Sequence, residues 1–220
     1  MMKRVLGAVM AMGMTGAPAL AQDNPFALKA DVYTVNVDKS LFYVVTRKDP
    51  NTLGSGLSHD HVIRATRFSG EVAWMKGNAS KCQFDVTVQV SGLVNDEPDM
   101  RRTAGMSDNL SESNRADVKK TMLAADQLNL ASHPTIQFSS TACSNTSGSN
   151  YDVVGELTLL GVTQSVTVPM SIKADGTSFG ASGEFSINGS DYGLKPKRAM
   201  AGQIRNQDKI EFYVTLGAKK

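Results

Sequence analysis

The residues with the clearest potential for chemistry are two histidines, His59 and His61. Residues two positions apart on a β-strand point to the same face, which would place both imidazoles on one side and Asp60 on the other. Paired imidazoles are a way to bind zinc or copper, and His133 is a candidate third ligand. The alternatives are a hydrogen-bonding role at a polar rim and a purely structural role. Because the chain has only 3 histidines and no dependable carboxylate partner for them, we assign no metal and expect no cofactor.

Two arginines, Arg101 and Arg102, are candidates of a second kind. Together with Arg115, Lys119 and Lys120 they are candidates to meet an anionic head group, because a guanidinium binds carboxylate or phosphate through parallel hydrogen bonds. The alternative is an ordinary solvated helical surface. We keep His59, His61, Arg101 and Arg102 as candidate head-group or rim residues.

Three common sequence signatures of enzymes are missing. The His-Glu-x-x-His zinc motif, the P-loop and the dinucleotide fingerprint do not occur. The acidic residues Asp96, Glu97 and Asp99 surround Pro98, and such a charged run is typical of a solvated loop. We therefore expect no enzymatic activity.

The first residues have the pattern of an export signal. Lys3 and Arg4 form a positive region, residues 5–17 are mostly apolar, and residues 19–21 (Ala-Leu-Ala) fit signal peptidase. The apolar run is shorter than the roughly 20 residues that cross a bilayer, and Gln22 instead of Cys argues against a lipid anchor. We expect residues 1–21 to be a signal peptide cleaved after Ala21, a periplasmic location, and no membrane span.

The charge of the remaining chain excludes some partners. The full chain has 23 basic and 21 acidic residues, and the two basic residues of the leader bring the mature chain to zero. Nothing in the net charge then argues for nucleic acid or for a polybasic membrane contact. With 41% hydrophobic residues and no long low-complexity tract, the chain is not disordered.

Most of the mature chain alternates between apolar and polar residues. The alternation is clear in residues 82–91, 136–139, 166–172, 179–187 and 210–216. A period of two with one polar face is typical of antiparallel strands. Short turn signals separate the runs, so we expect an all-β meander that closes on itself or packs on a second sheet to protect its edges.

Residues 94–130 break this alternation. In residues 111–125, Val118, Met122 and Ala125 recur at helical spacing, and Ser113 or Asn114 is a candidate N-cap. Pro134 prevents the helix from continuing, because proline disfavours helical dihedrals in the residue before it. We expect one or two short helices inserted between strands, covering one end of the sheet.

Two cysteines, Cys82 and Cys143, belong to a chain expected to be exported, where oxidation is permitted. Their strands flank the helical insertion, which favours proximity. The alternation of strand faces argues against a bond between them. Cys82 falls on the apolar face of its strand, whereas Cys143 falls on the face opposite to that of Ile136 and Phe138. A bulge or a strand end would reconcile the two, and we predict a disulfide.

The order of these features resembles the YceI-like family of exported lipocalin-like proteins, over nearly the whole mature chain. The matching segments are residues 56–61 (GLSHDH), 68–72 (FSGEV), 133–140 (HPTIQFSS), 154–163 (VGELTLLGVT), 190–194 (SDYGL) and 208–212 (DKIEF). The resemblance implies one YceI-like domain over residues 22–220. It also implies a lipocalin-like antiparallel β-barrel of about eight strands around a polyisoprenoid or similar long-chain amphiphile.

An apolar barrel lining follows from the alternation, and an eight-stranded barrel is wide enough for one small ligand. The predicted lining residues are Phe84, Val86, Val88, Ile136, Phe138, Leu157, Val166, Val168, Phe179, Phe185, Phe212 and Val214. The leading interpretation is a periplasmic binding or carrier protein for a long-chain lipid such as a polyisoprenoid or quinone.

Two further interpretations compete with lipid binding. One is a metal-binding or stress-responsive module that uses His59 and His61. The other is a scaffold whose filled barrel serves protein contacts. Whether the chain forms a homodimer is left open.

The leader generates the first prediction. Mass spectrometry of the exported protein should find a mature N-terminus at Gln22 or Asp23, because signal peptidase removes the leader. A membrane-held chain that still begins at Met1 would contradict it.

Overall fold

The structure is a computed structural model that describes residues 30–75, 77–78, 82–106 and 109–220. The expected signal peptide, residues 1–21, lies outside the described residues. Within the described ranges, no helix combines the length and the apolar character needed to cross a membrane.

Strands make up most of the described chain. They are β1 (Asp31–Val35), β2 (Leu41–Lys48), β3 (His61–Ala65), β4 (Phe68–Trp74), β5 (Gln83–Gln89), β6 (Leu93–Asn95), β7 (Thr135–Ser147), β8 (Asn150–Leu159), β9 (Val162–Ala174), β10 (Ser178–Asn188), β11 (Arg198–Ala199) and β12 (Ile204–Lys219). The helices are α1 (Pro98–Thr103) and α2 (Glu112–Leu123), with short 3-10 turns η1 (Val37–Lys39), η2 (Ser55–Leu57), η4 (Val90–Gly92), η5 (Gly189–Tyr192) and η6 (Met200–Gly202).

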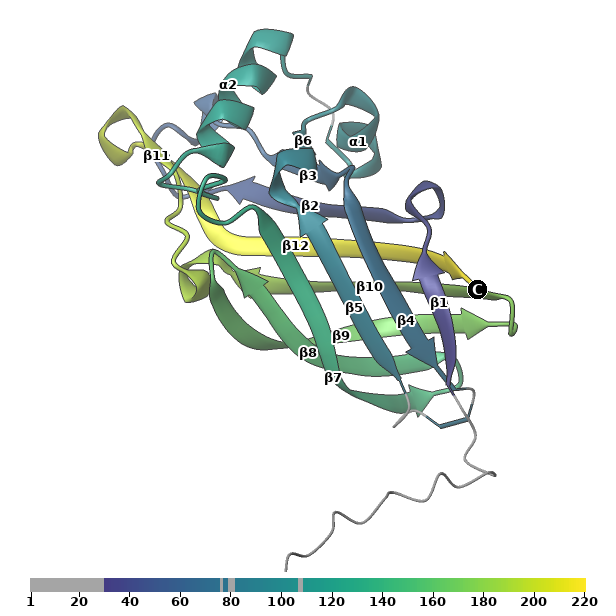
Figure 1. The fold of residues 1–220 in the computed structure, drawn as a ribbon. Helices are drawn as coiled ribbons and strands as arrows, with labels where there is room; N and C mark the ends of the chain where they lie inside the picture. The colour runs from purple at the N-terminus through teal and green to yellow at the C-terminus, as the bar shows by residue number, and fades with distance from the viewer. Residues whose placement is uncertain (1–29, 76, 79–81, 107–108) are drawn as a thin grey trace, which may run out of the picture.

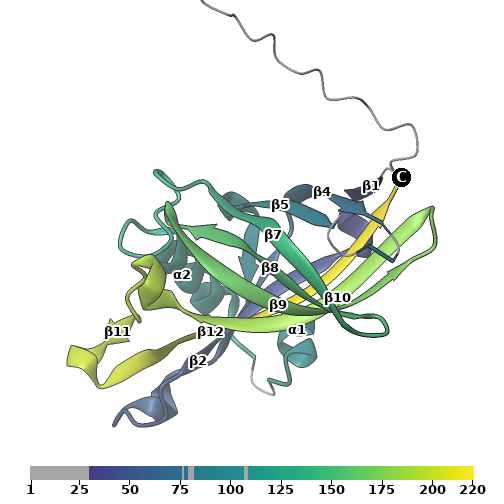
Figure 2. The same ribbon diagram turned by 90° about the horizontal axis from the view of Figure 1, so that it is seen from below.

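The sheet closes into a barrel. Its strands follow the order β1-β4-β5-β7-β8-β9-β10-β12, and β12 pairs back to β1 (Figures 1 and 2). All these pairings are antiparallel. The expected lipocalin-like antiparallel barrel of eight strands with a short helical insertion is confirmed.

The barrel wall has two levels because β12 changes partner along its length. Near its C-terminal end β12 pairs with β1, at Lys219 and Ala218. Over residues 206–215 it pairs instead with β2, and β3 and β6 continue the wall from there. One end of the barrel is thus closed by β1, and the other by β2, β3 and β6.

The wall opens where the helices are inserted. Pairing between β5 and β7 ends at Gln89 and Thr135, and a hydrogen bond from the Val90 N–H to the Pro134 carbonyl (2.9 Å) marks the divergence. β6 then pairs with β3 instead of β7, and α2 lies over this end of the barrel (Figure 1). The N-cap of α2 is Ser111, which accepts a hydrogen bond from the Asn114 N–H; the expected caps at Ser113 or Asn114 were wrong.

Aromatic side chains fill the end of the barrel that β1 closes. The Phe179 ring lies 5.6 Å from Tyr33 and 5.7 Å from both Trp74 and Phe84, measured between centroids. Tilted and edge-on contacts of this kind add about 0.5–1.5 kcal/mol each beyond area burial. This end is a packed core.

A disulfide joins Cys82 to Cys143, with the Cα atoms 6.0 Å apart. A bulge in β7 removes the parity conflict between the two. Ser140 pairs with Gly155 but Ala142 pairs with Val154, so one extra residue turns Cys143 to the inside, opposite the buried Val153.

Removing the disulfide should destabilise the barrel. The bond spans 61 positions, and closing a loop of that length stabilises a protein by about 4 kcal/mol through the unfolded state. A Cys82→Ser/Cys143→Ser variant should lose that amount in denaturant unfolding. Reduction of the wild-type protein should cause the same loss, and an unchanged midpoint in both would contradict the bond.

Candidate functional site

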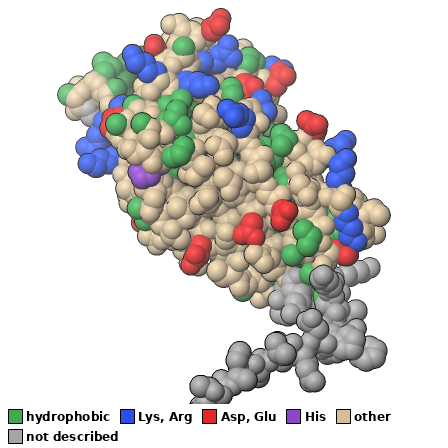
Figure 3. All heavy atoms as spheres, in the orientation of Figure 1, with side chains coloured by type: hydrophobic (Ala, Val, Ile, Leu, Met, Phe, Trp, Pro, Cys, Tyr) green, Lys and Arg blue, Asp and Glu red, His purple; other side chains and the backbone are tan. Residues whose placement is uncertain are grey.

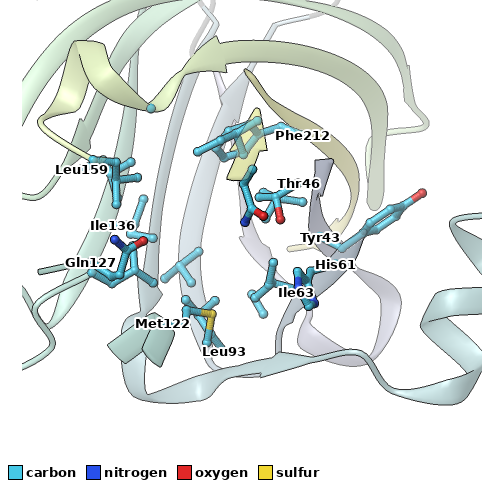
Figure 4. Close-up of a pocket in the computed structure, with 18 of the residues that line it drawn as sticks. Tyr43, Thr46, His61, Ile63, Leu93, Met122, Gln127, Ile136, Leu159 and Phe212 are labelled. Atoms are coloured by element: carbon cyan, nitrogen blue, oxygen red, sulfur yellow. The ribbon is translucent and has the colours of Figure 1, made fainter. Parts of the chain in front are cut away.

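The barrel is hollow between the aromatic core and α2. The cavity has a volume of about 570 Å³, within the range of about 300–1,000 Å³ that is usual for small-molecule sites. Its walls come from β2, β3, β5, β7, β8, β9, β10 and β12, and α2 closes one side. In Figure 4, Ile63, Ile136 and Leu159 are among the side chains directed into this space, whereas Tyr43 points away from it.

Ten of the twelve lining residues predicted from the alternation surround this cavity. They are Phe84, Val86, Val88, Ile136, Phe138, Leu157, Val168, Phe185, Phe212 and Val214. Phe179 does not, because it belongs to the aromatic core at the closed end. Val166 is half-buried and packs against other wall side chains without lining the cavity. The apolar–polar alternation predicts which face of a strand points into the barrel, but it does not predict how far along the barrel axis each residue lies.

Further lining residues were not predicted as lining from the sequence. Among them are Phe42 and Val44 on β2, Ile63 on β3, Leu93 on β6, and Val118 and Met122 on α2. The helical spacing of Val118 and Met122 was visible in the sequence. What it could not show is that this face of the helix covers an opening in a barrel.

Glycine makes room for the aromatic lining on β8. A Cβ built on Gly155 would lie 2.5 Å from Cζ of Phe138 and 2.8 Å from the Ser139 carbonyl oxygen. Any side chain there would displace the ring or the strand. On β10 and β12, Phe185 and Phe212 stack with their centroids 4.7 Å apart. All three rings line the cavity.

The cavity mouth is polar and is held in place by the loop after α2. Residues 195–199 and 206–208 line it. Lys197 pairs with Asp126 at 2.9 Å, and the Gln127 amide donates to the Lys195 carbonyl at 3.2 Å. The bond from Lys197 lowers the pKa of Asp126. The segment between β10 and β12 is therefore tied to the helical insertion across the opening.

A buried charged network lies behind one wall of the cavity. The Asp96 carboxylate, 1% exposed, accepts hydrogen bonds from Arg101 (2.7 Å) and from the Val62 N–H (3.2 Å). His61 Nδ1 lies 2.8 Å from its other oxygen, which also accepts from the Asn95 amide. Two interpretations of the sequence were wrong here. Asp96 is not solvated, and Arg101, also 1% exposed, is too deeply paired to meet a head group.

The environment of Asp96 favours its ionised form. Burial alone would raise its pKa, but hydrogen bonds from His61, Asn95 and the Val62 N–H outweigh burial, and the pKa is lowered. An ionised carboxylate can only accept hydrogen bonds, so Nδ1 of His61 must carry a proton. His61 also lines the cavity (Figure 4). A ring oriented through Nδ1 has Nε2 left for a second polar contact.

The remaining polar candidates do not gather at the cavity. β3 begins at His61, so His59 precedes the strand instead of sharing a face with His61. Asp60 between them turns back to accept from the Lys48 N–H and from Arg47. Arg102 is exposed on α1 and pairs with Asp99.

His133 lies elsewhere, against the β8–β9 turn, where its Cε1 is 3.1 Å from a Cβ built on Gly161. Among the residues that the structure describes, no three His, Cys, Asp or Glu side chains are grouped for a metal ion.

The fold and the cavity together define the class: a lipocalin-like antiparallel barrel with a hollow interior, consistent with a binding protein. Residues 33–216 match the YceI-like domain. The chain therefore belongs to the YceI-like family, which confirms the resemblance read from the sequence motifs.

Two curated relatives show this similarity in part. A UPF0312 protein of Azotobacter vinelandii is 32% identical over 98 residues, covering 42% of this chain and 51% of that protein. UPF0312 protein PputW619_0484 of Pseudomonas putida is 34% identical over 89 residues, covering 38% and 46%. The chain spans about half the length of these relatives, and neither name states an activity.

Solved structures share the fold. The crystal structure of Burkholderia cenocepacia BcnA has a TM-score of 0.64 at 19% identity, covering 84% of this chain and 99% of that one. The Campylobacter jejuni YceI protein has a TM-score of 0.54 at 15% identity, covering 72% and 84%. At these identities the likeness extends to the fold alone.

The charged network generates a stability prediction. Asp96→Asn removes one charged partner from a buried ion pair with Arg101, which should cost about 3–5 kcal/mol of unfolding free energy. Asp99→Asn removes an exposed partner of Arg102 from the same helix and should cost less than about 1 kcal/mol. Denaturant unfolding of both variants at neutral pH measures the difference.

The same network predicts an acid dependence. Since the pKa of Asp96 is lowered in the folded protein, its contribution is complete above about pH 4 and is lost as the pH falls further. The unfolding free energy of the Asp96→Asn variant should therefore fall less than that of the wild type as the pH is lowered below about 4. Equal stabilities for the Asp96 and Asp99 variants would contradict the role given to the network.

Proposed function

We propose that this protein binds a long-chain amphiphilic lipid, such as a polyisoprenoid or quinone, in the barrel cavity. The observation that carries the proposal is the cavity itself, about 570 Å³ of space lined by aliphatic and aromatic side chains. Its polar residues gather at the mouth. A chain-like apolar ligand with one polar end has the matching distribution of polarity.

The energetics of such a ligand are favourable without any ion pair. Each methylene transferred from water gains about 0.8 kcal/mol, so ten buried methylenes give about 8 kcal/mol gross. Lost ligand freedom offsets part of this gain. Useful affinity remains for a chain that inserts between Val88, Phe138 and Val214.

The polar end of the ligand lies at the mouth in this proposal. Thr46, His61 and Gln127 line the cavity among apolar neighbours. With Nδ1 of His61 held by Asp96, the other ring nitrogen is the group that would accept or donate a hydrogen bond to a hydroxyl or carbonyl of the ligand. This is the hydrogen-bonding alternative considered for the histidines.

The biological role that follows is carriage or sequestration of the lipid in the periplasm, without catalysis. The predicted leader supports export, and a closed cavity wall shields an apolar chain from water during transfer. The metal-binding and scaffold interpretations predict, respectively, stoichiometric metal and a protein that takes up no lipid.

The test is lipid retention by a variant with a charge inside the cavity. Val214 lines the cavity on β12, and its neighbour Thr215 is exposed on the outer face. Val214→Asp should abolish retention, because an unpaired carboxylate in an apolar site costs at least about 2 kcal/mol and usually more. Thr215→Asp, the same charge one residue away, should retain lipid as the wild type does.

The measurement is organic extraction and mass spectrometry of mature protein purified without detergent, followed by uptake of added polyprenol or quinone. Far-ultraviolet circular dichroism establishes that both variants fold, and Val214→Phe, which narrows the cavity without a charge, should reduce uptake of long chains. A lipid-free wild type that takes up neither probe would overturn the proposal.

A further inference from the structure

The most exposed large hydrophobic side chains of the described residues lie near the cavity mouth. Leu53, Leu57 and Met200 are 95%, 69% and 57% exposed, and they are the three most exposed large hydrophobic residues in the described chain. Exposed apolar side chains that cluster on a surface mark contact with a partner or a membrane. These three come from two loops that are far apart in sequence.

Hydrogen bonds hold the two loops together. The Gly54 N–H donates to the Gln203 carbonyl at 2.8 Å, and the Asp49 N–H donates to the Arg205 carbonyl at 2.8 Å. We call residues 52–57 and 195–203 the mouth tip. Both loops protrude beyond the barrel on the same side (Figure 2), and residues 195–199 of the tip also line the cavity mouth.

The mouth tip is basic. Residues 195–203 contain three basic residues and no acidic one, and Arg205 follows just beyond the tip. Lys197 pairs with Asp126, and Arg205 pairs with Asp49, whereas no ion pair holds Lys195 or Arg198 within the described ranges. Arg198 also lies directly across from Arg205 in the β11–β12 pairing. Arg205 has Asp49 as its partner, so a negatively charged partner would meet the exposed Lys195 and Arg198.

Figure 3 shows hydrophobic side chains beside Lys and Arg at the protruding corner where β11 lies in Figure 1. Leucine and methionine at the apex of a protrusion with lysine and arginine around them match an anionic bilayer, whose acyl region accepts the apolar side chains and whose head groups attract the cations.

We propose that the mouth tip docks the protein on the surface of an anionic lipid bilayer, which places the cavity mouth against the membrane. This docking surface is additional to lipid binding in the cavity. It rests on that proposed function only in its purpose, which is the loading and release of the lipid. Because the zero net charge of the mature chain gives no general attraction, the contact depends on the local charges of the tip and weakens as salt screens them.

Vesicle sedimentation tests the proposal with the mature protein and no cavity ligand added. The wild type should bind vesicles of phosphatidylcholine mixed with phosphatidylglycerol, and bind less to phosphatidylcholine alone. Leu53→Ser/Leu57→Ser should weaken partition about tenfold or more. Lys195→Gln/Arg198→Gln should weaken it roughly fivefold for each cation removed.

Matched controls lie at the opposite end of the barrel. Val37→Ser changes an exposed valine on η1, and Lys173→Gln/Lys219→Gln removes two exposed cations from β9 and β12. Both controls should bind vesicles as the wild type does. Uptake of polyprenol from solution, measured on every variant, separates failure of docking from failure of the cavity.

Three results would overturn the docking surface. They are no binding to either vesicle type, equal losses in the tip and control variants, and a dimer in solution that the Leu53→Ser/Leu57→Ser change dissolves. The last result would show that a second copy of the chain covers the tip. Loss of vesicle binding in the tip variants alone, with solution uptake unchanged in Leu53→Ser/Leu57→Ser, whose residues do not line the cavity, would support the proposal.

Discussion

The divided pairing of β12 is the constraint on which the rest of the structure depends. One long strand can close a barrel twice, with β1 at its C-terminal end and with β2 along the rest. The two closures produce two interiors. Where β1 closes the wall, aromatic rings meet around Phe179 and leave no space. Where β2, β3 and β6 close the wall, β6 does not pair with β7, and α2 covers the opening between them. The cavity exists because the strands that line it are bridged by a helix at that point instead of by another strand.

The helices that cover the opening are attached to the barrel wall by hydrogen bonds between buried polar groups. Asp96 binds α1 through Arg101 and binds β3 through His61 and the Val62 N–H. Asn95 beside it donates to the Arg115 carbonyl of α2 at 3.0 Å. A buried carboxylate is tolerated only when its hydrogen bonds are complete, so each partner is held as firmly as Asp96 itself. The same contact orients His61 at the cavity, which links the position of the helices to the polar end of the site.

The parts of this fold that repeat at short range could be predicted from the sequence. Alternation predicted antiparallel strands and ten residues of the cavity lining, because the side-chain period of a strand is a local property, whereas the eight-stranded barrel was implied by the family resemblance. Depth is not local: Phe179 and Phe185 lie on the same face of β10, but about 20 Å apart at about 3.3 Å per residue, and only Phe185 reaches the cavity. Likewise the run from Asp96 to Arg101 reads as a charged loop until the fold encloses it. Burial of a charge depends on segments that contact it from elsewhere in the chain.

Net charge is a poor guide to partners for the same reason: it does not report which side chains from distant parts of the sequence the fold brings together. Without the leader expected at residues 1–21 the chain would carry no net charge, which gave no reason to expect a membrane contact. Folding nevertheless brings Lys195 and Arg198 to the mouth, where no ion pair with a described residue holds them, and Leu53 and Leu57 lie on the adjoining loop. The Asp126 carboxylate pairs with Lys197 and so joins the tip to the loop after α2. The segment that carries the exposed cations is thus the segment that lines the cavity mouth and is linked to the helix covering it. The Lys197–Asp126 ion pair and the neighbouring Gln127 hydrogen bond join the tip to the loop after α2, so the position of the tip is coupled to that of the helix over the opening.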